Sequence, residues 1–263
     1  MHASVPQRDP RAAAALGVLT ANIHMGFDLL QRNFVLPRLR EAIRQTGADL
    51  VFLQEVQGSH RRHAARWQHW PQVPQYEYLA DTLWSDFAYG RNAVYPDGDH
   101  GNALLSRFPI RASTNHDVSI RGHENRGLLH CELELPGQQR HLHAICVHLG
   151  LRESHRRRQL DLLAALLRDH IPADAPLVVA GDFNDWRCAG HRRLRECGLV
   201  EAFESARGRL ARSFPALWPL LPLDRVYLRG LDIRDVDVPH GAPWSSLSDH
   251  LPLHVRVGVR PQG

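Results

Sequence analysis

The segment Val178–Trp186 reads VVAGDFNDW, and the fold class can be worked out from it. The apolar run Leu177–Ala180 predicts a short buried strand. Asp182, Asn184 and Asp185 follow that strand directly, where a rigid sheet can aim polar side chains into a cleft. The segment therefore predicts one strand of a sheet and a site at the end of that strand.

Four more predicted strands carry polar side chains at or next to one end. They are Leu16–Ile23 with Asn22, Asp49–Val56 with Glu55, His141–His148 with His148, and Leu253–Val259, which Asp249 and His250 precede. Each group alone is weak evidence, because single polar residues at strand ends are common. Together they indicate one shared site.

Further strands and helices fill the rest of the chain. Additional strands are predicted at Glu77–Leu83, Asn102–Ser106, Leu128–Leu135 and Arg225–Leu228, and a turn through Pro136 and Gly137 makes a hairpin of Leu128–Leu135 and His141–His148. Helices are predicted around Leu36, Leu39 and Ile43, ending at Gly47, and over Leu160–Leu167, with Arg156, Arg157 and Arg158 on the solvent face. Hairpins beside crossover helices, without a GxGxxG or GxxxxGK[ST] loop, favour a mixed-sheet α/β domain over a doubly wound nucleotide-binding one.

Composition sets the limits of the class. The 263 residues are 43% hydrophobic and 23% charged, which is typical of a globular protein with a sizeable core. The expected division is a flexible segment over residues 1–15 and a single domain over 16–263. No apolar run approaches the roughly 20 residues of a membrane-spanning helix, so we expect no stable membrane insertion.

The amino terminus and the cysteines predict an intracellular protein. Met1–Arg11 lacks the charged start and long apolar stretch of a secretion signal, which makes the cytoplasm the expected location. The four cysteines share no CxxC spacing, so they are expected to be free thiols and a zinc ribbon is excluded. Nothing in the sequence indicates an obligate protein partner.

The basic residues leave two interpretations open. The formal net charge is +4, and all 32 basic residues are arginine. The arginine fork suits phosphate and could indicate a phosphate-bearing substrate. A genome-wide compositional bias explains the same excess and is favoured. The 18 histidines are mostly scattered and expected at the surface, among them His116 and His170.

The strand-end groups share one chemical logic. Carboxylates and an amide without a thiolate cluster form a hard oxygen site, which suits Mg²⁺ or Mn²⁺ better than Zn²⁺. Hydrolysis of a phosphodiester needs a base for water, here Asp182, and donors for the phosphoryl oxygens, here Asn184, His148 and His250. An acid such as Asp224 or Asp249 beside a histidine would fix its tautomer and raise its pKa.

An ordered set of motifs carries a family resemblance. The segments TANIHMG, LVFLQEV, GNALLSRFPI, CVHLGL, VVAGDFNDW, LDRVYL and SDHLPL run from about residue 16 to residue 257. This set resembles the endonuclease/exonuclease/phosphatase superfamily, the metal-dependent phosphoesterases similar to deoxyribonuclease I, and among them the single-domain bacterial members without a settled substrate. The resemblance implies a four-layer α/β sandwich, in which two packed mixed β-sheets are flanked by helices.

The resemblance also implies a role for each matching residue. The divalent ion, Mg²⁺ with Mn²⁺ as a substitute, would be held by Asn22 and Glu55, with Asp249 as a further acid near it. The other matching residues would act on the water or the phosphate, or support those that do: His148, Asp182, Asn184, Asp224 and His250.

Two departures from the family pattern matter. Many relatives have an acid immediately before the glycine of GNALLS, where this chain has His100 after Asp99. Two interpretations stay open: Asp99 orients His148 after a small shift, or Asp99 belongs to a surface turn and does not orient it. Relatives that act on abasic DNA carry Asp two residues after the first Asn, where this chain has His24. The second difference argues against a DNA-repair specialist.

Three further residues are candidates for substrate binding. Asn102 could reach the substrate or could be a buried structural amide. Arg126 could hold a phosphate oxygen or pair with Glu124 or Glu132. Trp186 could stack on a base, line a lipid pocket or pack in the core.

The expected function is that of a metal-dependent phosphodiesterase that acts on nucleic acid. An alternative is a phospholipid or sphingolipid headgroup phosphodiesterase or phosphatase at a membrane surface, for which FPALWPLLPL (Phe214–Leu223) is either an exposed apolar loop or a buried connection. A catalytically silent binding module on the same scaffold and a zinc site built from histidines are more remote alternatives.

Overall fold

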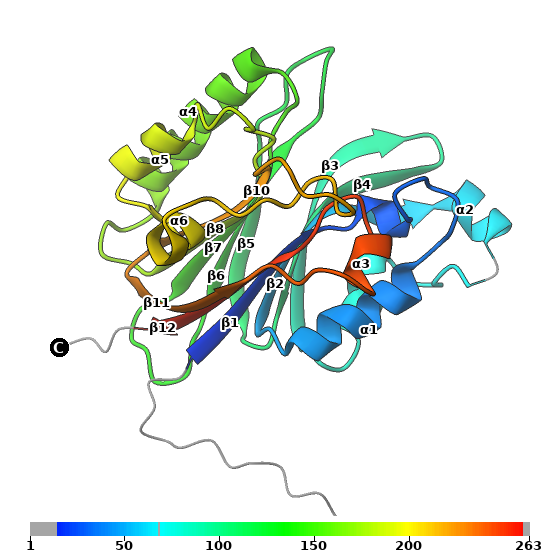
Figure 1. Ribbon diagram of the computed structural model, residues 1–263, viewed down its shortest axis with the longest axis horizontal. Coiled ribbons are helices and arrows are strands. Elements are labelled where there is room, and N and C mark those ends of the chain that lie inside the picture. Colours follow the sequence, from blue (N-terminus) through cyan, green and yellow to red (C-terminus); the bar gives the residue numbers. More distant parts are fainter. Residues whose placement is uncertain (1–14, 68, 260–263) are drawn as a thin grey trace, which may run out of the picture.

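The computed structural model describes residues 15–67 and 69–259, in which two six-stranded sheets lie face to face (Figure 1). The first sheet has the order β11-β12-β1-β2-β4-β3. Its strands are β1 (Ala15–Asn22), β2 (Leu50–His60), β3 (Asp86–Tyr95), β4 (Gly98–Ser106), β11 (Leu231–Asp237) and β12 (Leu253–Val259). The predicted flexible segment lies outside the described residues except for Ala15, which begins β1.

The second sheet has the order β5-β6-β7-β8-β10-β9. Its strands are β5 (Ile110–Asp117), β6 (Gly127–Leu133), β7 (Leu142–His148), β8 (Leu177–Asp182), β9 (Val200–Glu201) and β10 (Asp224–Arg229). Each sheet contains one parallel pair, β1 with β2 and β7 with β8, and the other pairs are antiparallel. Both sheets are therefore mixed, and the predicted hairpin is the antiparallel pair β6–β7.

Helices flank the two sheets. They are α1 (Leu36–Thr46), α2 (Arg61–Arg66), α3 (Gln75–Ala80), α4 (Glu153–His170), α5 (His191–Glu196) and α6 (Ala202–Arg207), with short 3-10 turns at His24–Gly26 and Trp244–Ser246. Figure 1 shows α1 and α3 on one side of the sandwich and α4 and α5 on the other. None of the helices in the described residues has the length and apolar composition needed to cross a bilayer.

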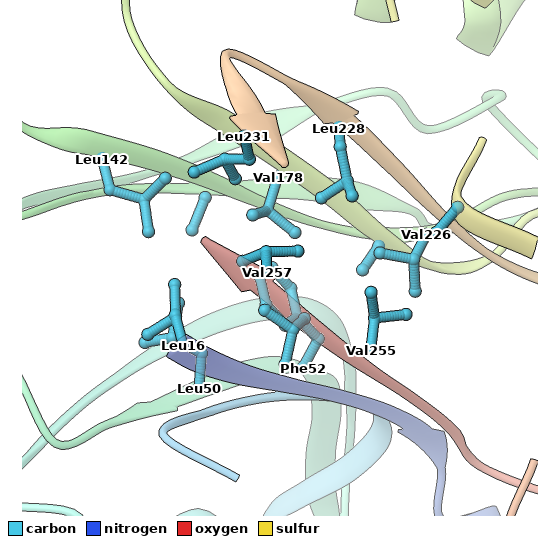
Figure 2. Packing of buried hydrophobic residues seen from close by; sticks show 14 of the residues in the cluster. Leu16, Leu50, Phe52, Leu142, Val178, Val226, Leu228, Leu231, Val255 and Val257 are labelled. Atoms are coloured by element: carbon cyan, nitrogen blue, oxygen red, sulfur yellow. The ribbon is translucent and has the colours of Figure 1, made fainter. Parts of the chain in front are cut away.

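Three buried clusters hold these layers together. The largest lies between the sheets and includes Phe52, Val178 and Val255 (Figure 2). A second packs α1 and α3 against the first sheet, and a third packs α4 and α5 against the second. Alternate residues of β2 and β8 enter different clusters because successive strand side chains point to opposite faces. The predicted four-layer sandwich is confirmed.

One predicted strand is wrong. Glu77–Leu83 was expected to be extended, but Gln75–Ala80 forms helix α3. Tyr76, Leu79 and Ala80 are spaced by three and four residues and pack on the first sheet, so a helical stripe was mistaken for a strand. The four cysteines are free thiols, as expected.

Candidate active site

Strand register brings the predicted site residues of the second sheet into one row. Asp182 ends β8, where His148 of β7 lies directly beside it on one side. On the other side, Asp224 at the start of β10 pairs with the same residue. The three side chains are 6% exposed or less. They therefore form a buried polar row at one end of the sheet.

The first sheet contributes Asn22, which contacts Asp182 directly, and Glu55, which contacts Asn22. Asn22 ends β1, and its amide nitrogen lies 3.3 Å from Asp182 Oδ2 and 3.2 Å from Glu55 Oε1. The amide oxygen of Asn22 accepts from the backbone N–H of His24 at 3.1 Å. The amide nitrogen of Asn22 thus joins the two carboxylates. To bind an ion through its amide oxygen, Asn22 would have to rotate its side-chain amide and lose the hydrogen bond from His24.

Glu55 reaches the site because the backbone of β2 is irregular. The β2–β4 register shifts between Leu53 and Val56, and Glu55 has a φ of 56°, a left-handed conformation that non-glycine residues rarely adopt. Asn184 beyond β8 also has a positive φ, of 50°. Such conformations are retained where the surrounding structure requires them, and they are frequent at functional sites. Here they accompany two of the predicted site residues.

Asp182 Oδ2 is the centre of the cluster. Oδ1 accepts from the backbone N–H of Asn184 at 2.8 Å. Oδ2 lies 3.6 Å from His148 Nε2 and 3.9 Å from His250 Nε2. Burial raises the pKa of Asp182 to about 7, and the charge of Asp224 adds to this whereas His250 opposes it.

An acid contacts the Nδ1 side of His250, and of the two acids considered, Asp224 and Asp249, it is Asp224. Its Nδ1 lies 2.8 Å from Asp224 Oδ2, and the hydroxyl of Ser213 donates to the same oxygen at 2.5 Å. Burial alone would lower the pKa of His250, but Asp224 and Asp182 outweigh it and raise the pKa to about 10. His250 is therefore a cation at neutral pH, with Nε2 directed toward Asp182.

His148 has a different environment. Burial lowers its pKa well below the usual value, and the charges of Arg126, His250 and His100 act in the same direction. Asp99, the acid considered as its partner, instead accepts from Tyr89 Oη at 2.7 Å and from Ser59 Oγ at 3.2 Å. His148 therefore enters the site as a neutral imidazole.

Asp249 lies at the rim beside Asn22. Ser248 Oγ is 2.7 Å from the carbonyl oxygen of Asn22 and 3.2 Å from Asp249 Oδ1. His24 Nδ1 is 3.9 Å from the same carboxylate oxygen. Sequence reasoning missed Ser248 and Ser213, because a serine in a loop has no pattern that distinguishes it before the loop is folded.

Asn184 and Asp185 fix the loop that follows β8. Asn184 Nδ2 donates to the carbonyl of Leu149 at 2.9 Å. Asp185 forms a buried ion pair with Arg225 and accepts from the N–H of Gly190 at 2.9 Å. The Arg225 guanidinium, 1% exposed, was also missed, and the sequence signal for it was its place directly after Asp224 in LDRVYL.

Two of the three further candidates for substrate binding, Asn102 and Arg126, have separate surroundings. Asn102 is fully buried on β4, and its amide nitrogen donates to the carbonyls of Gly127 at 2.9 Å and Cys146 at 3.4 Å, which links the two sheets. Arg126 Nε donates to the carbonyl of Leu149 at 3.3 Å, next to His148 in the chain. Contact of either residue with substrate stays a prediction.

The structure excludes one of the three alternatives for Trp186 and corrects the expectation for Arg156. Trp186 is not in the core: its ring is 48% exposed, with the Arg187 guanidinium 4.5 Å from the ring centroid. Arg156 is not on the solvent face of α4 but is buried, because its guanidinium donates to the carbonyls of Gly150 and Leu151.

The donor set fits a divalent cation. Asp182, Asp224 and His250 have ligand atoms within 4.8 Å of one another, and Glu55 and Asn22 adjoin them. Because Asp224 is engaged by the His250 ring and Ser213, and Asp182 Oδ2 lies beside both imidazoles, the Glu55 carboxylate is the better placed for an ion. Carboxylate oxygens without thiolates suit a hard cation. The roles of Asn22, Glu55 and Asp249 as its ligands stay predictions.

Comparison with known proteins agrees with this geometry. Residues 19–250 match the model of the Endonuclease/Exonuclease/phosphatase family. The chain belongs to this family. Its relatives include uncharacterized protein YbhP of Escherichia coli (strain K12), which is 50% identical over 244 residues that cover 91% of this chain and 95% of that protein.

Solved structures of the endonuclease/exonuclease/phosphatase family share the fold. A family member from Beutenbergia cavernae superposes with a TM-score of 0.77 at 20% identity, covering 93% of this chain and 72% of that one. D. rerio TDP2, complexed with single-strand DNA product, gives a TM-score of 0.66 at 17% identity, covering 93% and 99%. Members of this family are in general hydrolytic phosphoesterases that use a divalent metal.

Proposed function

We propose that this chain is a divalent-metal-dependent phosphodiesterase, with Mg²⁺ as the ion and Mn²⁺ as a substitute. The observation that carries the proposal is the convergence of Asn22, His148 and His250 on one buried carboxylate oxygen, Asp182 Oδ2, with Glu55 joined to them through Asn22. These residues come from both sheets and are separated by up to 228 positions in the chain (250 − 22). Burying acids and imidazoles costs stability, and a catalytic use accounts for a cluster that carries this cost.

The residues divide the chemistry among them. Asp182 Oδ2 is the base that orients water and accepts its proton, because burial raises the pKa of this carboxyl to about 7 and the amides of Asn22 and Asn184 hold Oδ2 at 3.3 and 3.4 Å, less closely than the Asn184 N–H holds Oδ1 at 2.8 Å. His250, kept cationic by Asp224, holds a phosphoryl oxygen on which negative charge accumulates. The neutral His148 donates a further hydrogen bond to the phosphate. A divalent ion bound at Glu55, with Asn22 and Asp249 nearby, would neutralise phosphate charge and stabilise the leaving oxygen.

The proposed substrate is nucleic acid, and single strands in particular. D. rerio TDP2, a structural neighbour, was crystallised with a single-strand DNA product. In this chain the exposed Trp186 ring, with Arg187 against it, follows Asn184 by two residues. An aromatic ring beside a guanidinium is a platform on which a base can stack, next to a site that handles its phosphate.

The test compares active-site variants on several substrates. Glu55→Gln and Asp182→Asn should each lower the rate on a chromogenic phosphodiester and on a single-stranded oligonucleotide by at least about a hundredfold with Mg²⁺. The matched controls Glu41→Gln and Asp169→Asn, which change exposed helix residues, should keep the full rate. Full turnover by both site variants, or activity that survives excess chelator, would contradict the proposal.

A second candidate is hydrolysis of a lipid headgroup, and one observation favours it. The loop before β10 is not a buried connection: Leu217, Trp218 and Leu220 are 65%, 75% and 54% exposed. The loop adjoins the site, because the Phe214 ring lies 4.9 Å from the His250 ring. Exposed apolar side chains at a site mouth suit a membrane surface.

Vesicle assays separate the two substrates. If lipid is the substrate, the chain releases a phosphorylated headgroup from mixed phospholipid vesicles, and replacing Trp218 by Ser reduces that release but not turnover of a soluble phosphodiester. Cleavage of oligonucleotide alone supports the nucleic-acid proposal. A cytoplasmic location and the lack of an obligate protein partner remain predictions from the sequence.

A further inference from the structure

A second cluster of ionisable side chains lies far from the phosphoesterase site. It comprises His116 on β5, His130 and Glu132 on β6, and His143 on β7, and we call it the histidine cluster. His130 and Glu132 lie on the same face of β6 as Leu128, which packs toward α4, so the cluster is on the outer face of the second sheet. His143 is near the start of β7, whereas the active-site histidine ends that strand.

The ligand atoms of three members are already close together. One atom each of His130, Glu132 and His143 lies within 4.8 Å of the other two. Glu132 and His143 are direct partners across the β6–β7 ladder, and His130 is two residues before Glu132. His130 Nε2 is 2.9 Å from His143 Nδ1. Two imidazoles on a tetrahedral zinc, each with a Zn–N distance of about 2.0–2.1 Å, have their nitrogens roughly 3.3 Å apart, so a small rotamer adjustment makes room for an ion.

Packing leaves one buried nitrogen of the cluster without a hydrogen-bond partner in the part of the chain that the structure describes. His116 Nε2 is buried without a hydrogen-bond partner in the described residues, although its ring stacks on His130 with centroids 6.1 Å apart. Burial lowers the pKa of His130 to about 4 and also lowers the pKa of His143 and His116. A neutral imidazole binds a metal through the ring nitrogen that carries no proton. One of the two facing nitrogens of His130 and His143 carries the N–H of their hydrogen bond, so that ring takes the other tautomer when both nitrogens bind an ion.

A surface pocket gives access to the cluster from solvent. Its volume is about 480 Å³, and its lining includes Glu132, His143, His141 and His170. His141 Nδ1 lies 3.6 Å from Glu132 Oε2, and the His170 ring at the end of α4 lies 6.0 Å from the His116 ring. More imidazoles thus surround the three central residues, and an ion bound there would have an open position toward the pocket.

We propose that His130, Glu132 and His143 bind a first-row transition-metal dication of the Zn²⁺ class, with a fourth position open to water in the pocket. Two imidazole nitrogens and one carboxylate suit Zn²⁺, Co²⁺ or Ni²⁺, whereas Mg²⁺ prefers an all-oxygen set. The ligand types thus separate this site from the oxygen-rich one at Glu55 and Asp182. The proposal does not depend on the reaction proposed above.

The test measures metal binding directly. Tag-free full-length chain, stripped with chelator and dialysed into millimolar Mg²⁺, is titrated with Zn²⁺ by calorimetry and with Co²⁺ by visible absorption. We expect one tight Zn²⁺ equivalent per chain and the intense bands of a tetrahedral Co²⁺ site. His143→Asn and Glu132→Gln should each weaken Zn²⁺ binding at least about a hundredfold, because even indirect supports of a zinc ligand change affinity 10–100-fold.

Two further variants make the outcome decisive. His240→Asn removes an exposed histidine outside the cluster, and Glu55→Gln alters the phosphoesterase site; both should keep the tight equivalent and the Co²⁺ bands. Unchanged Zn²⁺ affinity in His143→Asn and Glu132→Gln, with each folded by circular dichroism, would overturn the proposal. Loss of the tight equivalent in Glu55→Gln alone would overturn it as well, because the ion would then bind at the phosphoesterase site.

Discussion

His250 is a cation because two carboxylates face it, and only one of them lies behind the ring. Asp224 contacts Nδ1 at 2.8 Å, away from the side on which Nε2 approaches Asp182. Asp224 therefore sets the tautomer and charge of His250 without needing to touch a substrate. In the proposed reaction Asp224 is a positioning residue. It acts through His250, just as a residue that hydrogen-bonds to a metal ligand orients that ligand without touching the metal.

Replacing Asp224 by Asn tests this role. The amide keeps the size of the side chain but removes the charge that holds the pKa of His250 at about 10, so that pKa should fall toward its usual range. Turnover at pH 7 should decrease about 10- to 100-fold, and the alkaline limb of the pH–rate profile should move to lower pH. Ser213→Ala, which removes one hydrogen bond to Asp224, should have a smaller effect. An Asn variant with an unshifted profile would show that Asp224 acts only in packing.

The buried carboxyl of Glu201 should make the free energy of unfolding depend on pH. This residue is 2% exposed at the start of α6; its Oε2 accepts from the N–H of Glu204, and its Oε1 has no partner in the described residues. Burial raises its pKa from 4.5 to about 7. Between these pH values the folded chain binds more protons than the unfolded chain, so Glu201 lowers stability as pH rises, by an amount on the order of 2–3 kcal/mol above pH 7.

Glu201→Gln should remove this penalty. The amide oxygen can still accept from the Glu204 N–H, and it stays neutral at every pH. Urea unfolding should show the variant more stable than the parent at about pH 8 and equal to it near pH 4.5. The buried histidines, whose pKa values are lowered, reduce stability in acid by the same amount in the parent and in the variant. The difference between the two chains therefore reports Glu201 alone. A stability difference that is the same at both pH values would contradict the assignment.

At the scale of elements, the loops beyond the strands carry the substrate prediction. Trp186 lies in the loop after β8, so Trp186→Ala should raise the KM for a single-stranded oligonucleotide about fivefold or more, the value of one lost base–aromatic stack. A small chromogenic phosphodiester has no base in reach and should be turned over normally. Equal losses on both substrates would indicate that the ring supports the loop instead.

Strands rich in buried apolar residues could be predicted from the sequence, whereas strands with mostly polar, exposed residues could not. β1, β2, β7 and β8 are runs of buried residues, and the sequence located each of them. β5, an edge strand with mostly exposed or half-buried side chains, and likewise β3 and β11 gave no apolar signal and were missed. Whether a polar segment becomes a strand is decided by the neighbour with which it pairs.

The same limit applies to the candidate site. Polar residues at the ends of apolar strands were recognisable in the chain, and the structure brings Asn22, Glu55 and Asp182 into contact. The serine contacts of Ser213 and Ser248 depend on loops that return from distant parts of the chain, and no local pattern encodes that return. The irregular β2 that directs Glu55 into the site was equally invisible, since a β-bulge has no fixed sequence.

At the scale of the molecule, the site exists only while the two sheets stay together. Asn22 and Glu55 belong to the first sheet, and Asp182 belongs to the second. The interior between them, not the site itself, holds these halves in register. Phe52 on β2 is fully buried and belongs to the cluster that fills this interior (Figure 2).

Phe52→Ala should therefore lower the free energy of unfolding by about 3–5 kcal/mol, the usual effect of removing a buried phenyl ring. Because the site spans both sheets, activity and tryptophan fluorescence should be lost at the same urea concentration, at a lower midpoint than in the parent chain. In the absence of urea the variant should retain most of its turnover, since the Phe52 ring belongs to the interior cluster and takes no part in the proposed chemistry. Phe87→Ala, which changes a ring that is 42% exposed, should shift the midpoint much less. If activity disappeared well before the fluorescence change, the sheets would be separating locally at the site, and the interior would not be what holds its two halves together.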